Sequence, residues 1–181
     1  MNRFVSIDAN TTSIAIAVWD NDQLQHVGKL FWEGKTNYEK VVDASKKINA
    51  FFAIHKEVSY IVIEQTAFLN SPKTFSDLAM VQGAIIAAIS SVQNISVRSV
   101  PPIAWQTFIK NGRLTTPEKQ VIRNQFPGKS DAWYKNKERE FRKQRTIDFV
   151  SKRYNRSVSD NDIADAIGIG HYAIFNWEKL G

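Results

Sequence analysis

The sequence of 181 residues contains no cysteine, which excludes disulfide bridges and zinc sites built on thiolates. No continuous apolar run approaches the ~20 residues that a membrane-spanning helix needs. Asp8 interrupts the short apolar stretch near the N-terminus, so the pattern of a signal peptide is missing. We therefore expect a single domain over residues 1–181, located in the cytoplasm, with no membrane partner.

Acidic residues are scarce in one part of the chain. From Arg98 to Arg156 there are 15 Lys and Arg against 5 Asp and Glu, a net charge of +10, whereas the remainder has 9 against 13, a net of −4. This uneven distribution favours a polyanion bound by the basic region and a separate role for the carboxylates elsewhere. The plain alternative is a solvated basic helix.

The spacing of apolar residues predicts an α/β chain. Predicted strands cover Arg3–Asp8, Thr12–Asp20, Leu24–Trp32, Val58–Ile63 and Ile95–Val100. Predicted helices cover Asn37–His55, Pro72–Gln93, Ile103–Lys110, Pro117–Phe126, Asp131–Asn155 and Asp160–Trp177. The first three strands, joined by short turns, indicate an antiparallel meander, and the fourth, a continuous apolar run after a helix, indicates a buried parallel strand. The order predicts one domain around a mixed sheet.

Four carboxylates stand at comparable ends of these elements. Asp8 ends the first strand, Glu64 ends the fourth, and Asp162 and Asp165 are spaced i, i+3 on the last helix. If the first and fourth strands are parallel neighbours, Asp8 and Glu64 leave the sheet at the same edge. Three of the four residues also have a plain explanation: Asp8 as a turn former, and the helical pair as a complement to the helix dipole.

Such a cluster predicts a metal site. Two unit charges ~4 Å apart repel by about 4 kcal/mol at an effective dielectric constant near 20, and divalent cations remove this repulsion. Ligation by oxygen alone suits Mg²⁺ or Mn²⁺, and two ions roughly 4 Å apart are the arrangement that hydrolyses phosphodiesters. We therefore expect Asp8, Glu64, Asp162 and Asp165 to bind two Mg²⁺ or Mn²⁺ ions.

Six segments in order resemble the RuvC family of Holliday junction resolvases, particularly its phage-encoded members: VSIDANTTSIAIAVW, IVIEQTAF, FSDLAMVQGAIIAAI, VRSVPPIAWQTF, TPEKQ and DIADAIGIGHYA. The resemblance implies an RNase H-like α/β fold, with a central five-stranded mixed sheet flanked by helices. It also implies a homodimer that binds branched DNA, especially four-way junctions, and cuts two strands symmetrically to leave 5′-phosphate ends. A phage-encoded chain would act in the cytoplasm of its host.

The resemblance assigns roles to particular residues. Asp8, Glu64, Asp162 and Asp165 match the family's catalytic carboxylates. Lys119 matches a lysine near the scissile phosphate, whose charge would offset negative charge in the transition state.

There are three departures from the family pattern. The turn after Asp8 lacks the usual glycine, and Trp105 replaces a second family lysine. Phe68 lies one position beyond the family's junction-facing aromatic residue. It would either stack on an unpaired base or fill a core or dimer contact.

The segment from Gly128 to Arg156 is longer and more basic than in cellular members and resembles an insertion in phage relatives, near residues 128–156. A basic helix there would contact phosphates rather than read the base sequence. The expected DNA contacts in this segment are Lys129, Lys135, Lys137, Arg139, Arg142, Lys143 and Arg145. Further candidates outside it are Lys73, Lys110 and Arg113.

Three other functions fit parts of the pattern. The same metal site would serve a general branched-DNA or flap endonuclease, and the same fold without catalysis would serve a DNA-binding protein. The Asp-x-x-Thr-Thr-Ser sequence after the first strand also resembles the phosphate loop of the actin and sugar-kinase superfamily. However, those proteins need two such domains, and this turn lacks the glycine that lets backbone amides approach a phosphate.

Overall fold

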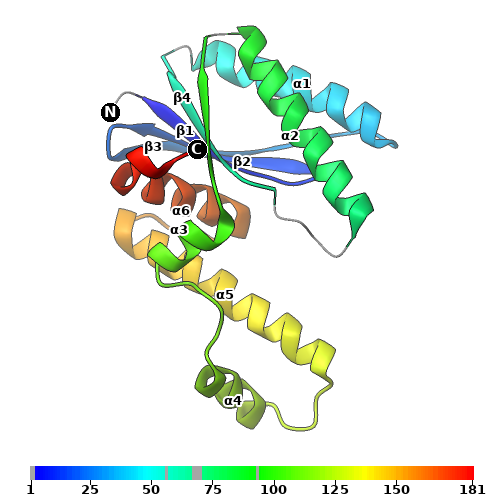
Figure 1. The fold of residues 1–181 in the computed structure, drawn as a ribbon, viewed down its shortest axis with the longest axis vertical. Helices are drawn as coiled ribbons and strands as arrows, with labels where there is room; N and C mark the ends of the chain where they lie inside the picture. Colours follow the sequence, from blue (N-terminus) through cyan, green and yellow to red (C-terminus); the bar gives the residue numbers. More distant parts are fainter. Residues whose placement is uncertain (1–2, 56, 67–70, 93) are drawn as a thin grey trace.

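The computed structural model describes residues 3–55, 57–66, 71–92 and 94–181. A five-stranded sheet forms its centre, with the strands in the order β3-β2-β1-β4-β5 (Figure 1). The strands are β1 (Phe4–Ala9), β2 (Ser13–Asp20), β3 (Gln23–Phe31), β4 (Tyr60–Glu64) and β5 (Ser96–Val100). The ends of the described helices and strands differ from the sequence prediction by at most two residues.

The pairing of the strands confirms the predicted topology. β1, β2 and β3 form an antiparallel meander, whereas β4 pairs in parallel with β1 and β5 in parallel with β4. In the β1–β4 pair, Ile7 lies opposite Ile63. The next residue on each strand is a carboxylate, so Asp8 and Glu64 leave the sheet side by side.

Helices cover both faces of the sheet, as the α/β prediction requires. On one face lie α1 (Asn37–Ile54) and α2 (Pro72–Val92); on the other lie α3 (Pro102–Phe108) and α6 (Asn161–Phe175), followed by the short helix η1 (Trp177–Lys179) (Figure 1). The alternation of side chains along the strands supplies a separate apolar core to each face. The chain therefore has the predicted architecture of a mixed sheet between two helical layers.

Two glycines allow α6 to approach the sheet closely. A Cβ atom on Gly170 would lie 2.6 Å from Ser6 Oγ and 2.3 Å from the Trp19 ring, and one on Gly168 would lie 2.7 Å from the Trp105 ring. Without side chains at these positions, Ser6 Oγ donates a hydrogen bond to the backbone oxygen of Ala166 at 2.6 Å. This contact fixes the helix that carries Asp162 and Asp165 against β1.

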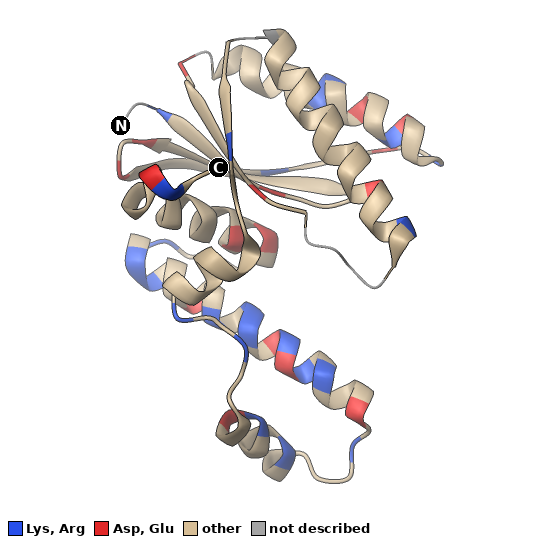
Figure 2. Cartoon of the chain, viewed as in Figure 1, with Lys and Arg blue, Asp and Glu red and all other residues tan. Residues whose placement is uncertain are grey.

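Helices α4 (Thr116–Gln125) and α5 (Asp131–Tyr154) form an extension that projects away from the sheet (Figure 1). We call α4 and the adjoining first part of α5, residues 116–145, the arm. A small apolar cluster of Leu114, Ile122 and Tyr134 holds the two helices together. The last part of α5 packs against α6, and its Val150 belongs to the sheet core. One continuous helix thus connects the arm to the core, and the arm carries many of the basic residues (Figure 2).

Helix α2 is more apolar than the sequence analysis recognised. Residues Pro72–Ser91 form a helix that is long and apolar enough to cross a membrane by length and composition alone, and among the described residues no second helix passes that test. Looking only for a continuous apolar run missed this helix, because serines and a glycine interrupt it. Its buried residues, Val81, Ile85, Ala88 and Ile89, pack in the core of the α1–α2 face. Its other side exposes the small residues Ala79, Gly83 and Ala87, which gives the helix two apolar sides.

Candidate active site

Asp8 is partly buried at the carboxyl end of β1. Burial raises the pKa of its carboxyl group well above the ordinary value, and the charges of Asp165, Glu64 and Asp162 raise it further, while Lys29 lowers it. These charge effects indicate that Asp165, Glu64 and Asp162 all lie near Asp8, so the four predicted carboxylates share one region of the structure. Their convergence at the sheet edge follows from the parallel β1–β4 pair and the close approach of α6.

Glu64 is held from two sides. Trp105 Nε1 donates a hydrogen bond to Glu64 Oε1 at 2.6 Å, and Gln82 Nε2 donates one to the Glu64 backbone oxygen at 2.9 Å. Burial raises the pKa of the Glu64 carboxyl group, and the bond from Trp105 opposes that rise. Trp105 stands where the family resemblance expects a lysine. Its uncharged ring nitrogen orients Glu64 but does not neutralise the carboxylate.

The start of α6 places the other two carboxylates. Asp160 is the N-cap, and its Oδ1 accepts from the backbone nitrogens of Asp162 at 2.9 Å and Ile163 at 3.0 Å. Burial raises the pKa of Asp165 to about 7, with further increases from the charges of Glu64 and Asp162; a hydrogen bond from Thr146 and the charge of Lys143 act in the opposite direction. The helix dipole alone does not explain Asp165, because a nearby helix N-terminus lowers a carboxyl pKa.

Asn10 explains how the turn after β1 forms without glycine. Its Oδ1 accepts hydrogen bonds from the backbone nitrogens of Thr12 at 2.9 Å and Ser13 at 2.8 Å, which closes an Asx-type turn. Its Nδ2 donates to Asp162 Oδ2 at 3.0 Å. The turn is therefore tied directly to the carboxylate cluster. Sequence reasoning noted the missing glycine but did not identify this role for Asn10.

Lys29, on β3, is a site residue that the sequence analysis missed. Its Nζ lies 2.7 Å from Asp162 Oδ2 and 2.9 Å from Asp160 Oδ2. Burial lowers the pKa of Lys29, but hydrogen bonds to Asp162 and Asp160 outweigh that effect and raise the pKa above its ordinary value. The sequence offered one signal, a lysine on a strand whose nearby residues Leu30 and Val27 pack against the core. The local sequence did not show which residues would pair with this lysine.

The donor atoms of the cluster fit a hard divalent cation. All four side chains offer oxygen only, and their mutual repulsion would be relieved by positive charge. Their positions are not those of a preformed site: among the described residues, no group of three or more acidic or histidine side chains is arranged to hold one metal ion. Contacts with other residues hold two of these carboxylates in their present positions. Asp162 contacts Lys29 and Asn10, and Glu64 accepts a hydrogen bond from Trp105.

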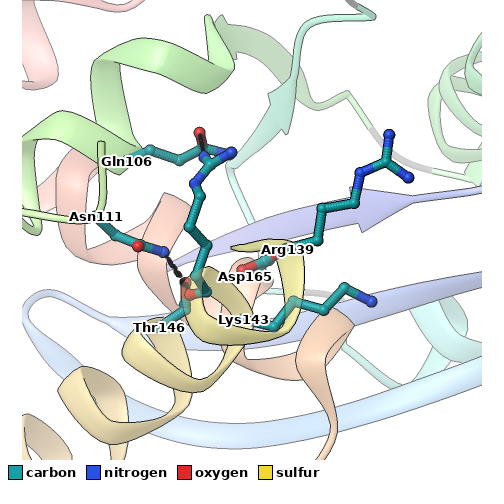
Figure 3. Close-up of a pocket in the computed structure, with 7 residues that line it drawn as sticks. Gln106, Asn111, Arg139, Lys143, Thr146 and Asp165 are labelled. Carbon is teal, nitrogen blue, oxygen red and sulfur yellow. Dashed lines mark hydrogen bonds between the residues drawn. The ribbon is translucent and has the colours of Figure 1, made fainter. Parts of the chain in front are cut away.

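A cavity of about 180 Å³ opens beside Asp165. Its cationic lining comes from α5, with Arg139, Arg142 and Lys143, and Figure 3 shows the labelled Arg139 and Lys143 side chains extending past the Asp165 carboxyl group. Arg142 Nη2 donates to Gln106 Oε1 at 2.5 Å, which ties α5 to α3. Arg139, Arg142 and Lys143, all expected as DNA contacts, therefore line the cavity beside Asp165.

Lys119 lies in the arm, on α4. Its Nζ is 3.5 Å from Glu138 Oε2, and it lines a second hollow of about 500 Å³ together with Arg113, Lys135 and Arg139. The structure does not bring Lys119 into the cavity beside Asp165, which Lys143 lines instead. The order of motifs along the chain pointed to Lys119, but the path of the arm carries it away from the sheet.

Several of the other expected DNA contacts also interact with neighbouring residues of the chain. Arg145 forms an ion pair with Glu118, and Lys137 with Glu140 at 2.8 Å, so both also stabilise the arm. Lys129 lies over the Trp133 ring at 5.9 Å. Lys73 pairs with Asp77 at 2.7 Å at the start of α2, and Lys110 follows α3 with a positive φ of 60°. Phe68 lies outside the described residues.

Comparisons with known proteins identify the fold. No protein-family model and no curated protein matches the sequence. The solved structure of Thermus thermophilus RuvC with a Holliday junction substrate aligns with a TM-score of 0.69 and 12% sequence identity, covering 99% of this chain and 96% of that one. RuvC of the same organism alone gives a TM-score of 0.67 at 11% identity, over 98% and 96%.

A third solved structure, the yeast mitochondrial Holliday junction resolvase, aligns with a TM-score of 0.54 at 11% identity, covering 96% of this chain and 78% of that one. Together with the sheet order, these alignments show that the chain has an RNase H-like fold. Within that class its fold is RuvC-like over nearly the whole chain.

Proposed function

We propose that this chain is a metal-dependent endonuclease that cuts branched DNA, with four-way junctions as its preferred substrate. The observation that carries the proposal is the cluster of Asp8, Glu64, Asp162 and Asp165 beside a cationic cavity. The chain folds like RuvC, and the RuvC structure with the best alignment above holds a Holliday junction. Clustered acids whose pKa values are raised by burial and by one another are typical of functional sites rather than of stable cores.

Mg²⁺ or Mn²⁺ is the proposed cofactor. Asp8, Glu64, Asp162 and Asp165 are the candidate ligands, and a bound ion would activate water and stabilise the departing 3′-oxygen of the phosphodiester. The chain's own residues supply the rest: Trp105 orients Glu64, Asn10 orients Asp162, and Lys143 places positive charge beside Asp165.

The arm is proposed to bind one duplex of the branched substrate. Arg113, Lys135 and Arg139 line its hollow, and no ion pair formed within the described part of the chain involves them. Cations without protein partners are the ones free to replace counterions on phosphates. This longer, basic segment is also the feature that favours a phage-type member of the group, acting in the host cytoplasm.

A homodimer is proposed through α2. The exposed stripe of Ala79, Gly83 and Ala87 would let a second helix approach closely. A Cβ atom on Gly83 meets nothing within 4 Å, so Gly83→Leu tests the interface without disturbing the fold of the single chain. Sedimentation equilibrium should show a dimer for the parent and a weakened dimer for Gly83→Leu. Ala50→Leu, on the exposed side of α1, is the matched control.

The substrate class is tested by comparing rates on three DNAs of equal length. With Mg²⁺ present, a four-way junction should be cut faster than a 5′-flap, and a plain duplex least. Equal cutting of junction and flap would favour the general branched-DNA nuclease. Binding to the junction without cutting in either Mg²⁺ or Mn²⁺ would contradict the proposal and leave a DNA-binding protein of the same fold.

A further inference from the structure

Lys29 bridges two carboxylates at the start of α6. Its Nζ lies 2.7 Å from Asp162 Oδ2, and 2.9 and 3.2 Å from the two carboxylate oxygens of Asp160. The Lys29 side chain is only 15% exposed. It reaches this position from β3, an edge strand of the sheet, so the contact joins two elements that are far apart in sequence.

The partners of Lys29 are themselves fixed. Asp160 is the N-cap of α6 and accepts two backbone hydrogen bonds. Asp162 Oδ2, the atom that contacts Lys29, also accepts from Asn10 Nδ2 at 3.0 Å. Asn10 is held in turn by the backbone of Thr12 and Ser13. Two positively polarised donors therefore occupy the same carboxylate oxygen, and both are held by further bonds. Exposed ion pairs lack such support, which is one reason why they contribute little.

This contact divides the carboxylate cluster. Asp162 has a resident cation, whereas Asp8, Glu64 and Asp165 form no ion pair with any residue that the structure describes. A divalent ion bound through Asp162 Oδ2 would have to displace Lys29 from that oxygen and leave its largely buried ammonium group paired with Asp160 alone. Losing one of its two carboxylate partners is unfavourable for a largely buried cation.

We propose that Lys29 takes the place of the second divalent ion. It holds Asp162 away from metal ligation, so that the chain binds one ion, at Asp8, Glu64 and Asp165, where four free carboxylates would bind two. Lys29 is thus a positioning residue that sets the number of ions. The proposal rests on the proposed function only in assuming that the cluster binds a divalent cation.

The number of bound ions tests this directly, in the absence of DNA. Free Mn²⁺ is measured by electron paramagnetic resonance as it is added to the purified protein. The parent should bind one Mn²⁺ per chain and Lys29→Met two. Lys29→Arg, which keeps the charge, should bind one. Lys47→Met is the matched control, because Lys47 on α1 also bridges two carboxylates, Asp43 at 2.7 Å and Glu33 at 3.9 Å, on the opposite face of the sheet.

Each other outcome overturns the proposal. Two ions on the parent would mean that a metal displaces Lys29, and one ion on Lys29→Met would mean that Lys29 does not limit the count. Absence of binding to both would remove the cation site itself. Circular dichroism melts establish that each variant is folded before ions are counted. The nuclease assay is independent: a parent that binds one ion but cuts no DNA overturns the function alone, and one that cuts with two ions overturns only this proposal.

Discussion

The pKa of a carboxyl group is raised at the sheet edge and lowered in the arm. At the sheet edge, burial and neighbouring acids raise the pKa of Asp165 to about 7. In the arm, hydrogen bonds from Thr115 and Arg145 lower the pKa of Glu118 to about 2. Glu118 also completes the capping box that starts α4, by accepting from the Thr115 backbone nitrogen at 2.7 Å.

The contrast distinguishes charged residues that stabilise the fold, in the arm, from charged residues that we assign to function, at the sheet edge. The arm places Arg145, Arg123, Lys119 and Lys137 within ion-pair distance of Glu118, Asp131, Glu138 and Glu140. The sheet edge gathers three acids with no such partner among the described residues, although the fold would be more stable without their repulsion. Local violations of this kind are expected where a chain has a function to perform. Variants that exchange or remove charges in the two regions therefore have different expected effects.

The largest effect is expected from Asp8→Asn. Loss of this carboxylate should lower Mg²⁺-dependent junction cutting by more than about 100-fold, the upper end of what removing a group that merely supports a metal ligand costs. Junction binding should persist, because the cationic arm is unchanged. Single-turnover cleavage and a gel-shift assay measure the two quantities. The control, Glu118→Gln, removes an acid of the arm and should keep its cutting activity; equal losses in both variants would refute the distinction between the regions.

The next effect concerns stability without metal. The folded pKa of Asp165 is above its ordinary value of 3.8, so the folded state binds this proton more tightly than the unfolded state. The resulting stability is present below about pH 4 and is lost as the pH rises to about 7. Asp165→Asn should therefore be more stable than the parent at pH 8, by at most about 4 kcal/mol, and the difference should vanish near pH 4.

Urea unfolding in EDTA at these two pH values measures the difference. Glu118→Gln should behave in the opposite sense, because the lowered pKa of Glu118 contributes stability that is present at neutral pH and lost as the pH falls through about 2. A stabilised Glu118→Gln, or an Asp165→Asn that is less stable than the parent at pH 8, would contradict the assignment of the two acids.

A smaller effect is expected from neutralising the unpaired cations of the arm. The triple variant Lys135→Gln, Arg139→Gln, Lys143→Gln should bind the junction more weakly and reduce the slope of log affinity against log salt by about 3, roughly one per phosphate contact. The control neutralises Lys35, Lys40 and Lys46 at or near α1, on the opposite face of the sheet. If the control changes the slope as much, the DNA does not lie on the arm.

The smallest effect separates Lys143 from Lys119. Because Lys143 lines the cavity beside Asp165, Lys143→Met should slow single-turnover cutting by roughly tenfold, or about 1.4 kcal/mol. Lys119 pairs with Glu138 in the arm, and Lys119→Met should leave the cutting step unchanged at saturating enzyme. The reverse order would support the role that the family resemblance assigned to Lys119.

Much of the fold was predictable from the sequence because its signals are local. The apolar run ending at Glu64 and the apolar, β-branched and aromatic runs of β1 and β2 indicated strands, and the parallel β1–β4 pair places Asp8 beside Glu64. The i, i+3 spacing placed Asp162 and Asp165 on one helical face. Those inferences needed only the geometry of regular elements.

The remaining features depend on contacts between distant segments. Lys29 and Asp160 are 131 residues apart, and Asn10 and Asp162 are 152 apart, so no local pattern links them. Lys119 follows its motif in order, but its position depends on the path of the arm, which is set by the Leu114, Ile122 and Tyr134 cluster. The sequence did not show that Trp105 reaches Glu64. The position of the Trp105 ring depends on α6, because only a glycine at position 168 leaves room for that ring.

The most direct test of the central claim is a cleavage map of a four-way junction with each strand labelled in turn. In Mg²⁺, the parent should give paired nicks at the same position in two opposed strands, each with a 5′-phosphate, and Asp8→Asn should give none. Unpaired nicks, or nicks that persist undiminished in Asp8→Asn, would contradict the assignment of the carboxylate cluster as the centre of a junction-cutting nuclease.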